Sequence, residues 1–124
     1  MTGRDRGAGS ILTAALAVCI ALGVVWGAWV IGWVTSVHRA GRIADLAAIA
    51  GAQAAMAHQT DHCETARAVA TRNRGRVVEC RLEGEIPSFV LRIEVETDLT
   101  PSITLPGTPR VALGRAVAGP GADG

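Results

Sequence analysis

Two cysteines, Cys63 and Cys80, are the residues of this 124-residue chain best placed to do chemistry. Two thiols separated by 17 residues can close a loop as a disulfide, which in the chain-entropy treatment stabilises a fold by roughly 3 kcal/mol. A core this small supplies little more than that by itself. We therefore predict a structural disulfide between Cys63 and Cys80, the alternative being two separate buried thiols. The third cysteine, Cys19, lies in an apolar segment and is predicted to be inert.

A second group of residues, His58, His62 and Cys63, has a spacing that suits a metal ion. Histidines at positions i and i+4 lie on one face of a helix, as they do in zinc-binding helices. Asp61, however, is a good helix N-cap, and a helix that begins there separates the two histidines. We therefore expect no metal site and no cofactor, and interpret the histidines as solvated linker residues.

The chain carries no arrangement typical of an enzyme or of a nucleic-acid-binding protein. It has no GxSxG, no GxGxxG and no phosphate-binding loop. Its net charge is +1, and three Trp and one Phe are its only aromatic residues, which leaves little for binding nucleic acid. The acidic residues of 79–98 suit the solvated face of strands and their turns. We expect no catalytic residues and no nucleic-acid partner.

A long apolar segment must position this chemistry relative to a membrane. No Asp, Glu or Arg lies between Arg6 and Arg39, and about 20 apolar residues in a helix cross a bilayer. The segment predicts a transmembrane helix over 8–37, behind a charged leader at 1–7. A secretory signal has a shorter apolar stretch and a small-residue cleavage site, so an uncleaved anchor is favoured.

The orientation of this helix follows from the charges and the cysteines. Two arginines lie before the apolar segment and two after it, so the positive-inside count is tied. The short N-terminal tail and the predicted disulfide, which suggests an oxidising compartment, decide the orientation. We predict a single-pass protein of the inner (cytoplasmic) membrane, with its N-terminus cytoplasmic and its C-terminal domain extracytoplasmic.

Small residues lie on one face of the predicted span, within about 60° of one another at 100° per residue. Such a face lets helix backbones approach closely and predicts lateral helix packing, although an alanine-rich chain can also produce it by chance. The residues of this face are Ser10, Ala14, Ala17, Ala21, Ala28 and Gly32. Trp26, Trp29 and Trp33 form a second stripe about a third of a turn away.

Helical composition continues beyond the membrane, because the first proline is Pro87. We expect residues 38–60 to be an extramembrane extension of the same helix. This extension is too apolar to stand alone in water, and we expect it to pack against its own C-terminal domain and against neighbouring copies.

The remaining residues predict a small α+β domain over 61–118, followed by a disordered tail at 119–124. A short helix is expected from Asp61 to Arg74, with a capping box formed by Asp61 and Glu64 and a stop at Gly75. Its apolar stripe is Cys63, Ala66, Val69 and Ala70.

Alternation of apolar and polar residues predicts strands over 76–82 and 88–99. A third strand is expected over 110–118, where the alanine content also allows a helix. A turn is expected at Glu83–Glu85. The inward faces are expected to carry Val78, Cys80 and Leu82 in the first strand and Phe89, Leu91, Ile93 and Val95 in the second. The resulting fold class is α+β and pilin-like: a long N-terminal transmembrane helix continues into a domain with a short helix and an antiparallel sheet of two or three strands.

The order of these parts resembles the actinobacterial TadE/TadG-like proteins of the Flp (tight-adherence) pilus assembly group. The resemblance covers most of the chain, and its more specific part is the alanine-rich stretch together with the two spaced cysteines. The residues that carry it are Arg6–Gly7, Ala8–Ser10, Ala44–Ala52, Cys63–Ala66, Ala70–Asn73, Val78–Cys80 and Arg115–Pro120.

The resemblance implies a non-enzymatic minor pilin or pseudopilin-like subunit of a type IV pilus-related assembly or secretion system. Its implied partners are membrane lipid, the other subunits of the machine, other pilin-like helices and a prepilin peptidase that cuts between Gly7 and Ala8. Pilins of the broader class usually carry Glu at the fifth mature position, where this chain has Leu12. The alternative interpretation is a single-pass membrane protein with an external protein-binding module, either an envelope sensor or a partner subunit.

Overall fold

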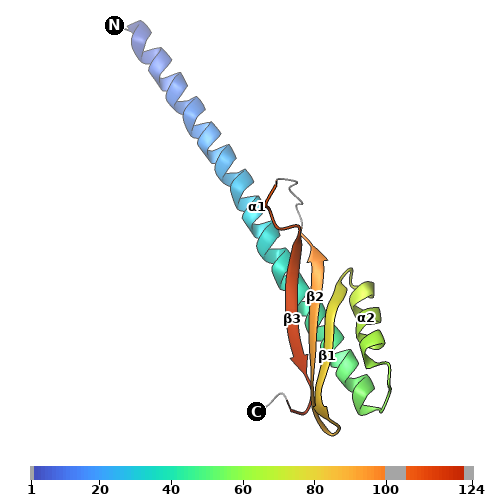
Figure 1. Cartoon of the computed structure of the whole chain (residues 1–124). Coiled ribbons are helices and arrows are strands. Elements are labelled where there is room, and N and C mark those ends of the chain that lie inside the picture. Colours follow the sequence, from blue (N-terminus) through green and yellow to red (C-terminus); the bar gives the residue numbers. More distant parts are fainter. Residues whose placement is uncertain (1, 100–105, 122–124) are drawn as a thin grey trace. The chain divides into compact units, whose positions relative to one another are not determined.

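The computed structural model describes the backbone of residues 2–99 and 106–121, and the side chains of these residues from Gly7 onward. In chain order it contains α1 (Thr2–Met56), α2 (His62–Arg72), β1 (Arg76–Glu85), β2 (Ser88–Asp98) and β3 (Val111–Ala118) (Figure 1). The chain divides into two compact units, Met1–Gly32 and Trp33–Gly124. The α+β fold class is confirmed.

The first unit consists of the N-terminal part of α1. Nearly all of its described large apolar side chains are exposed, Leu12 at 73% and Leu16 at 60% among them, and Val30 is half-buried. A helix forms here because alanine and leucine have high helix propensity and no proline interrupts them.

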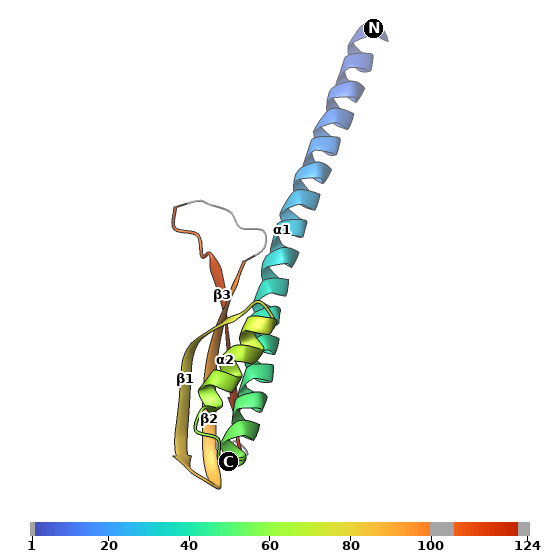
Figure 2. The same cartoon turned by 90° about the vertical axis from the view of Figure 1, so that its right-hand side faces the viewer.

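The second unit is a sheet covered on one face by two helices. The strand order is β1-β2-β3 and both pairings are antiparallel. The C-terminal part of α1 and all of α2 lie on the same face of the sheet (Figures 1 and 2). The opposite face is open to solvent, as the alternating pattern of β2 predicted.

The core between these layers joins large residues of β2 to small residues of the helices. Phe89, Leu91, Ile93 and Val95 of β2 are almost fully buried, and this inward face was predicted correctly. The helices contribute mainly alanine, which allows the sheet to approach closely. These alanines are Ala44, Ala47, Ala48, Ala52 and Ala55 of α1 and Ala66 and Ala70 of α2.

Gly114 of β3 lies directly against the backbone of α1. A Cβ atom added at Gly114 would overlap the backbone of Ala40 and Gly41. Only glycine therefore fits at position 114, because even an alanine methyl would push the strand away from the helix.

The first strand differs from its prediction at both ends. A register shift between Val77 and Glu79 marks a β-bulge, which turns Val77 toward the core and leaves Val78 half exposed. The expectation that Val78 faces inward was wrong, because a bulge interrupts the two-residue alternation. Cys80 and Leu82 do pack against the core.

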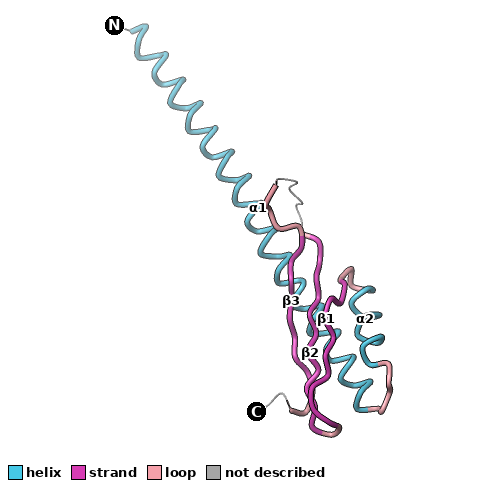
Figure 3. The backbone as a smooth tube through the Cα atoms, viewed as in Figure 1, coloured by secondary structure: helices cyan, strands magenta, loops and turns pink. Residues whose placement is uncertain are grey.

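The turn between the first two strands also lies later than predicted. Residues 83–85 belong to β1 and pair with 88–90 of β2, so the connection is Ile86–Pro87, joined by a cis peptide bond. The secondary-structure path is shown in Figure 3.

The ends of α2 are built differently from the predicted capping box and glycine stop. Asp61 is at the N-cap but has φ −104° and ψ 33°, and its side chain makes no capping hydrogen bond. Glu64 forms an ion pair with Arg67 instead, at 3.5 Å. The capping-box prediction was wrong because Asp61 does not adopt the extended backbone that such a cap requires.

At the other end of α2, Arg74 is the residue with positive φ, at 62°. Gly75 is required for another reason: a Cβ there would lie 2.9 Å from side-chain atoms of both Ile43 and Val95. The glycine thus permits packing of the turn on α1 and β2.

Two predicted segments lie partly outside the described residues. The loop between β2 and β3 is described only at 99 and from 106, and the C-terminal tail only to Gly121. Within the described part of that tail, the Gly121 N–H donates to Phe89 O at 3.2 Å.

Candidate functional site

The surface of the first unit is the first candidate for function. α1 is long and apolar enough to cross a membrane, with its candidate segment beginning at Gly7. Gly7 and Ala8, the predicted cleavage position, lie inside the helix and are exposed. The predicted packing residues Ser10, Ala14, Ala17, Ala21 and Ala28 are exposed, and Gly32 is half-buried.

The second unit contains a different helix surface on the C-terminal part of α1. One side of this segment is buried under the sheet, so it is not a solvated tether. The other side exposes Leu46, Ile49 and Met56, each to about half of its surface. We call these three residues the outer stripe; their spacing of three and seven residues places them on one side of the helix. The predicted packing of this segment on its own domain is confirmed for the buried side only.

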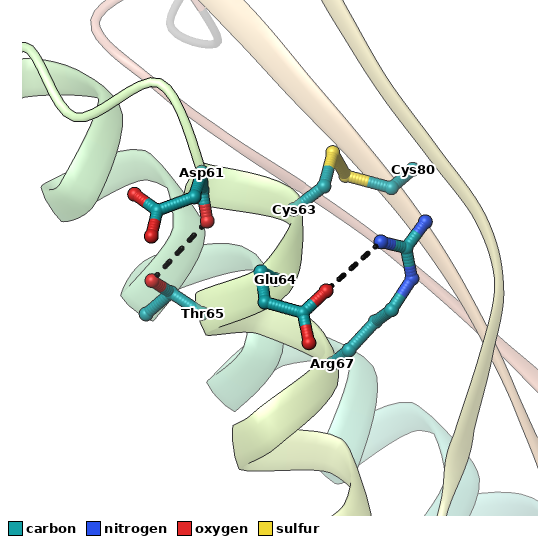
Figure 4. The surroundings of a disulfide bond; sticks show 6 residues. All are labelled: Asp61, Cys63, Glu64, Thr65, Arg67 and Cys80. Carbon is teal, nitrogen blue, oxygen red and sulfur yellow. Dashed lines mark hydrogen bonds and ion pairs between the residues drawn. A yellow bond between two sulfur atoms is a disulfide. The ribbon is translucent and has the colours of Figure 1, made fainter.

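The disulfide predicted between Cys63 and Cys80 is present. It joins the first turn of α2 to the middle of β1 with a Cα–Cα distance of 6.0 Å (Figure 4), within the usual range. The buried residues of α2 are two alanines, Ala66 and Ala70, and the disulfide adds a covalent link between α2 and the sheet. Cys19 is free and exposed on α1.

The two histidines considered as metal ligands, His58 and His62, lie in different structural elements. His58 has φ 58° and lies in the turn after α1, whereas His62 is the first residue of α2. Among the described residues, no group of three or more His, Cys, Asp or Glu could hold a metal ion.

The open face of the sheet is covered by ion pairs between strands. Arg76 contacts Glu96 at 2.9 Å and Asp98 at 3.4 Å, Arg92 contacts Glu83 at 3.0 Å, and Arg115 contacts Glu94 at 2.9 Å. Hydrogen bonds to these carboxylates, and then their charges, raise the pKa of Arg76 and of Arg115. Both arginines are therefore fixed as cations.

A shallow depression of about 280 Å³ lies on this open face, lined by residues that include Glu79, Arg92, Glu94 and Arg115. Each of these four charged side chains is in an ion pair. Groups occupied in this way are poor proton donors or acceptors for a substrate, so the depression has the character of a solvated surface.

The chain matches no family model, no curated protein and no solved structure with which it was compared.

Sequence reasoning missed two features of the second unit. The outer stripe could have been found from the spacing of Leu46, Ile49 and Met56, but which side of the helix the sheet covers was not known. The other feature is the uneven pairing of arginines, which depends on contacts between residues far apart in the chain.

Proposed function

We propose that this chain is a non-enzymatic, single-pass membrane subunit of a pilus-like assembly or a related secretion system. In this proposal it is a pilin-like or pseudopilin-like protein of the TadE/TadG-like type, with a cytoplasmic N-terminus and an extracytoplasmic α+β domain. The observation that carries the proposal is the surface of α1 before Trp33, which is uncharged from Gly7 onward and exposes apolar side chains throughout.

Exposed apolar surface on this scale marks contact with lipid or protein. Lipid alone can cover the large side chains, but a face of small residues brings helix backbones close together. The outer stripe of the second unit gives independent support, because it leaves apolar surface uncovered on a part of α1 that follows the predicted span. An assembly in which like helices lie alongside one another covers both surfaces.

The helix also continues where the alternative interpretation requires an interruption. A membrane protein with a separate binding module would have its helix end near Arg42, with the alanine-rich stretch folded back. Helix α1 instead runs through Arg42 to Met56. This continuity supports the assembly subunit over the separate module.

The test is photo-crosslinking in cells that produce the whole machine. A photoreactive residue at Ala28 reports on the small-residue face, and one at Trp26 is a matched control, two residues away and about 160° around the helix. We expect Ala28 to give adducts with machine subunits or with a second copy, and Trp26 to give far fewer. Recovery of monomers alone from both positions would overturn the assembly role.

The processing step is tested separately by mass mapping of the mature N-terminus from native membranes. A mature start at Ala8 supports cleavage by a prepilin peptidase, and an intact Met1 supports a plain anchor. Leu12, where pilins of the broader class usually carry Glu, bears on both processing and filament incorporation, so mass mapping and crosslinking are both needed.

A further inference from the structure

The arginines of the second unit fall into two groups. Of the ten arginines from Trp33 onward, one group has a carboxylate within ion-pair distance: Arg67, Arg76, Arg81, Arg92 and Arg115. The other group has no such partner among the described residues and is exposed: Arg39, Arg42, Arg72, Arg74 and Arg110. We call this second group the arginine collar.

The contacts of the second unit bring the collar together at one end. Arg39 Nη2 donates to Asn73 O at 3.4 Å, and Asn73 lies between Arg72 and Arg74 in the chain. The Leu99 N–H donates to Arg110 O at 3.0 Å, and Leu99 packs with Ala40 and Ala112 in one buried cluster. The turn after α2 and the residue before β3 therefore both lie beside α1 at Arg39–Arg42.

This end of the unit is the one at which the chain enters from the apolar segment. β1 begins there, β2 ends there and β3 begins there (Figures 1 and 2). Arg39 and Arg42 lie two and five residues beyond the end of the predicted span at residue 37, which corresponds to about 3 Å and 8 Å of helix. The headgroup layer on each side of the hydrocarbon core is about 5–8 Å thick.

Unpaired negative charge lies mainly elsewhere. Asp61 precedes α2 and Glu85 ends β1, so both lie at the opposite end of the unit. Asp45 is the exception, since it is exposed on α1 one turn beyond Arg42. The described part of the unit thus has a surplus of positive charge beside the predicted span.

The chemistry of the collar suits phosphate. A guanidinium group donates two parallel hydrogen bonds to a phosphate or carboxylate and stays charged. Thr35, His38, Arg39 and Arg42 line a depression of about 480 Å³ on α1, which is large enough for a phosphate group. We propose that the arginine collar binds the phosphate groups of anionic lipid headgroups and seats the second unit on the membrane surface.

Lipid is favoured over an acidic protein partner because of where the collar lies along the chain. An embedded α1 holds the collar next to headgroups at all times, whereas a protein partner must diffuse to it. The inference rests on the membrane part of the proposed function and not on the assembly role.

The experiment uses the full-length chain in vesicles of phosphatidylcholine containing brominated phosphatidylglycerol or brominated phosphatidylcholine. With Trp26→Phe and Trp29→Phe in every variant, Trp33 is the only tryptophan of the sequence. Bromine on the upper part of the acyl chain then quenches Trp33, so quenching compares the two lipids next to the collar. Near an anionic surface each arginine contributes about fivefold in affinity. We expect the phosphatidylglycerol preference to fall at least fivefold in a variant with Arg39→Gln, Arg42→Gln, Arg72→Gln and Arg74→Gln.

The matched control removes the same number of charges from paired arginines, with Arg67→Gln, Arg81→Gln, Arg92→Gln and Arg115→Gln. We expect it to keep the preference of the wild type if its disulfide and circular dichroism spectrum are intact. The pair Arg67→Gln and Arg81→Gln replaces it if the fourfold variant unfolds, with Arg39→Gln and Arg42→Gln as the corresponding collar pair. An equal loss in collar and control variants would overturn the proposal, because net charge and not position would then explain it.

Three further outcomes distinguish a lipid phosphate from a free anion, and a failure of the collar from a failure of membrane anchoring. Saturable binding of inorganic phosphate in lipid-free detergent that the collar substitutions remove, together with equal quenching by both lipids in vesicles, would overturn lipid as the ligand in favour of a free anion. Equal quenching by both lipids in the wild type would overturn the collar but leave α1 embedded. Quenching by neither lipid would overturn membrane anchoring, and the proposed function with it.

Discussion

The two parts of α1 use similar residues in opposite ways. Before Trp33, alanine and glycine alternate with large apolar residues and nearly every described side chain is exposed. After Trp33, alanines of the same helix are almost fully buried under the sheet, Ala40, Ala44 and Ala47 among them. The difference lies in what covers them: the sheet covers the alanines of the second part, whereas the described alanines of the first part are exposed.

This comparison shows what a stripe of small residues does and does not indicate. A small residue allows another backbone to come close, as Gly114 comes close to Ala40 in the second unit. It does not specify whether that backbone is a strand of the same chain or a helix of another. Substitutions in one part of α1, with a matched substitution in the other part as a control, separate the two possibilities.

The largest effect is expected from removing a core leucine. Leu91→Ala deletes a fully buried side chain and should lower the free energy of unfolding of the second unit by about 2–5 kcal/mol. Leu16→Ala in the first unit is the control, because the Leu16 side chain is exposed. Pulse proteolysis over a urea series in mild detergent measures both. Equal losses in the two variants would mean that the units do not fold independently.

The second-largest effect is expected from removing the disulfide. Cys63→Ser combined with Cys80→Ser removes a link across 17 residues and should cost the second unit roughly 3 kcal/mol in the chain-entropy treatment. Cys19→Ser is the control, since this thiol is free and exposed. In the same urea series, an unfolding midpoint unchanged by the double substitution would show that apolar contacts alone hold α2 in place.

Enlarging an alanine distinguishes the two parts of α1 directly. Ala47→Leu inserts three carbon atoms between helix and sheet, where Ala47 is fully buried, and should cost about 1–3 kcal/mol. Ala21→Leu should leave the unfolding of the second unit unchanged, because Ala21 is exposed. If the small-residue face contacts other helices, Ala21→Leu should instead lower the crosslinking yield from Ala28 in cells.

Much of this architecture follows from sequence because its signals are local. The uncharged segment before Arg39, the alternation from Phe89 to Val95 and the two cysteines each act through residues close in the chain or through one simple pairing. The helix-packing face and the leader cleavage at Gly7–Ala8 remain predictions, because both concern partners outside this chain.

The features missed depend on geometry that no local pattern encodes. The bulge at Val77–Glu79 places Val77 against the core and leaves Val78 half exposed. No residue type in this strand marks the position of the bulge. Asp61 has the right side chain for a cap but the wrong backbone angles. The clustering of the collar arginines is visible only in the folded structure, because Arg39, Arg72 and Arg110 are far apart in sequence.

The smallest effect is expected from a surface ion pair, and it tests the division between paired and unpaired arginines. Arg115 contacts Glu94 at 2.9 Å on the open sheet face, and this hydrogen bond, followed by the charge of Glu94, raises the pKa of Arg115. Because folding raises the pKa of Arg115, the ion pair stabilises the folded state fully at any pH below the pKa of this arginine in the unfolded chain. This stabilisation is lost only at strongly alkaline pH. Arg115→Gln should therefore lower the urea midpoint slightly and by the same amount at pH 7 and pH 9. The difference should shrink in 1 M salt, which screens exposed charges.

Arg110→Gln, at an unpaired arginine just before the same strand, is the control and should leave the urea midpoint unchanged at low and at high salt. A larger loss from Arg110→Gln than from Arg115→Gln would show that Arg110 has a partner within the protein and does not belong to the collar.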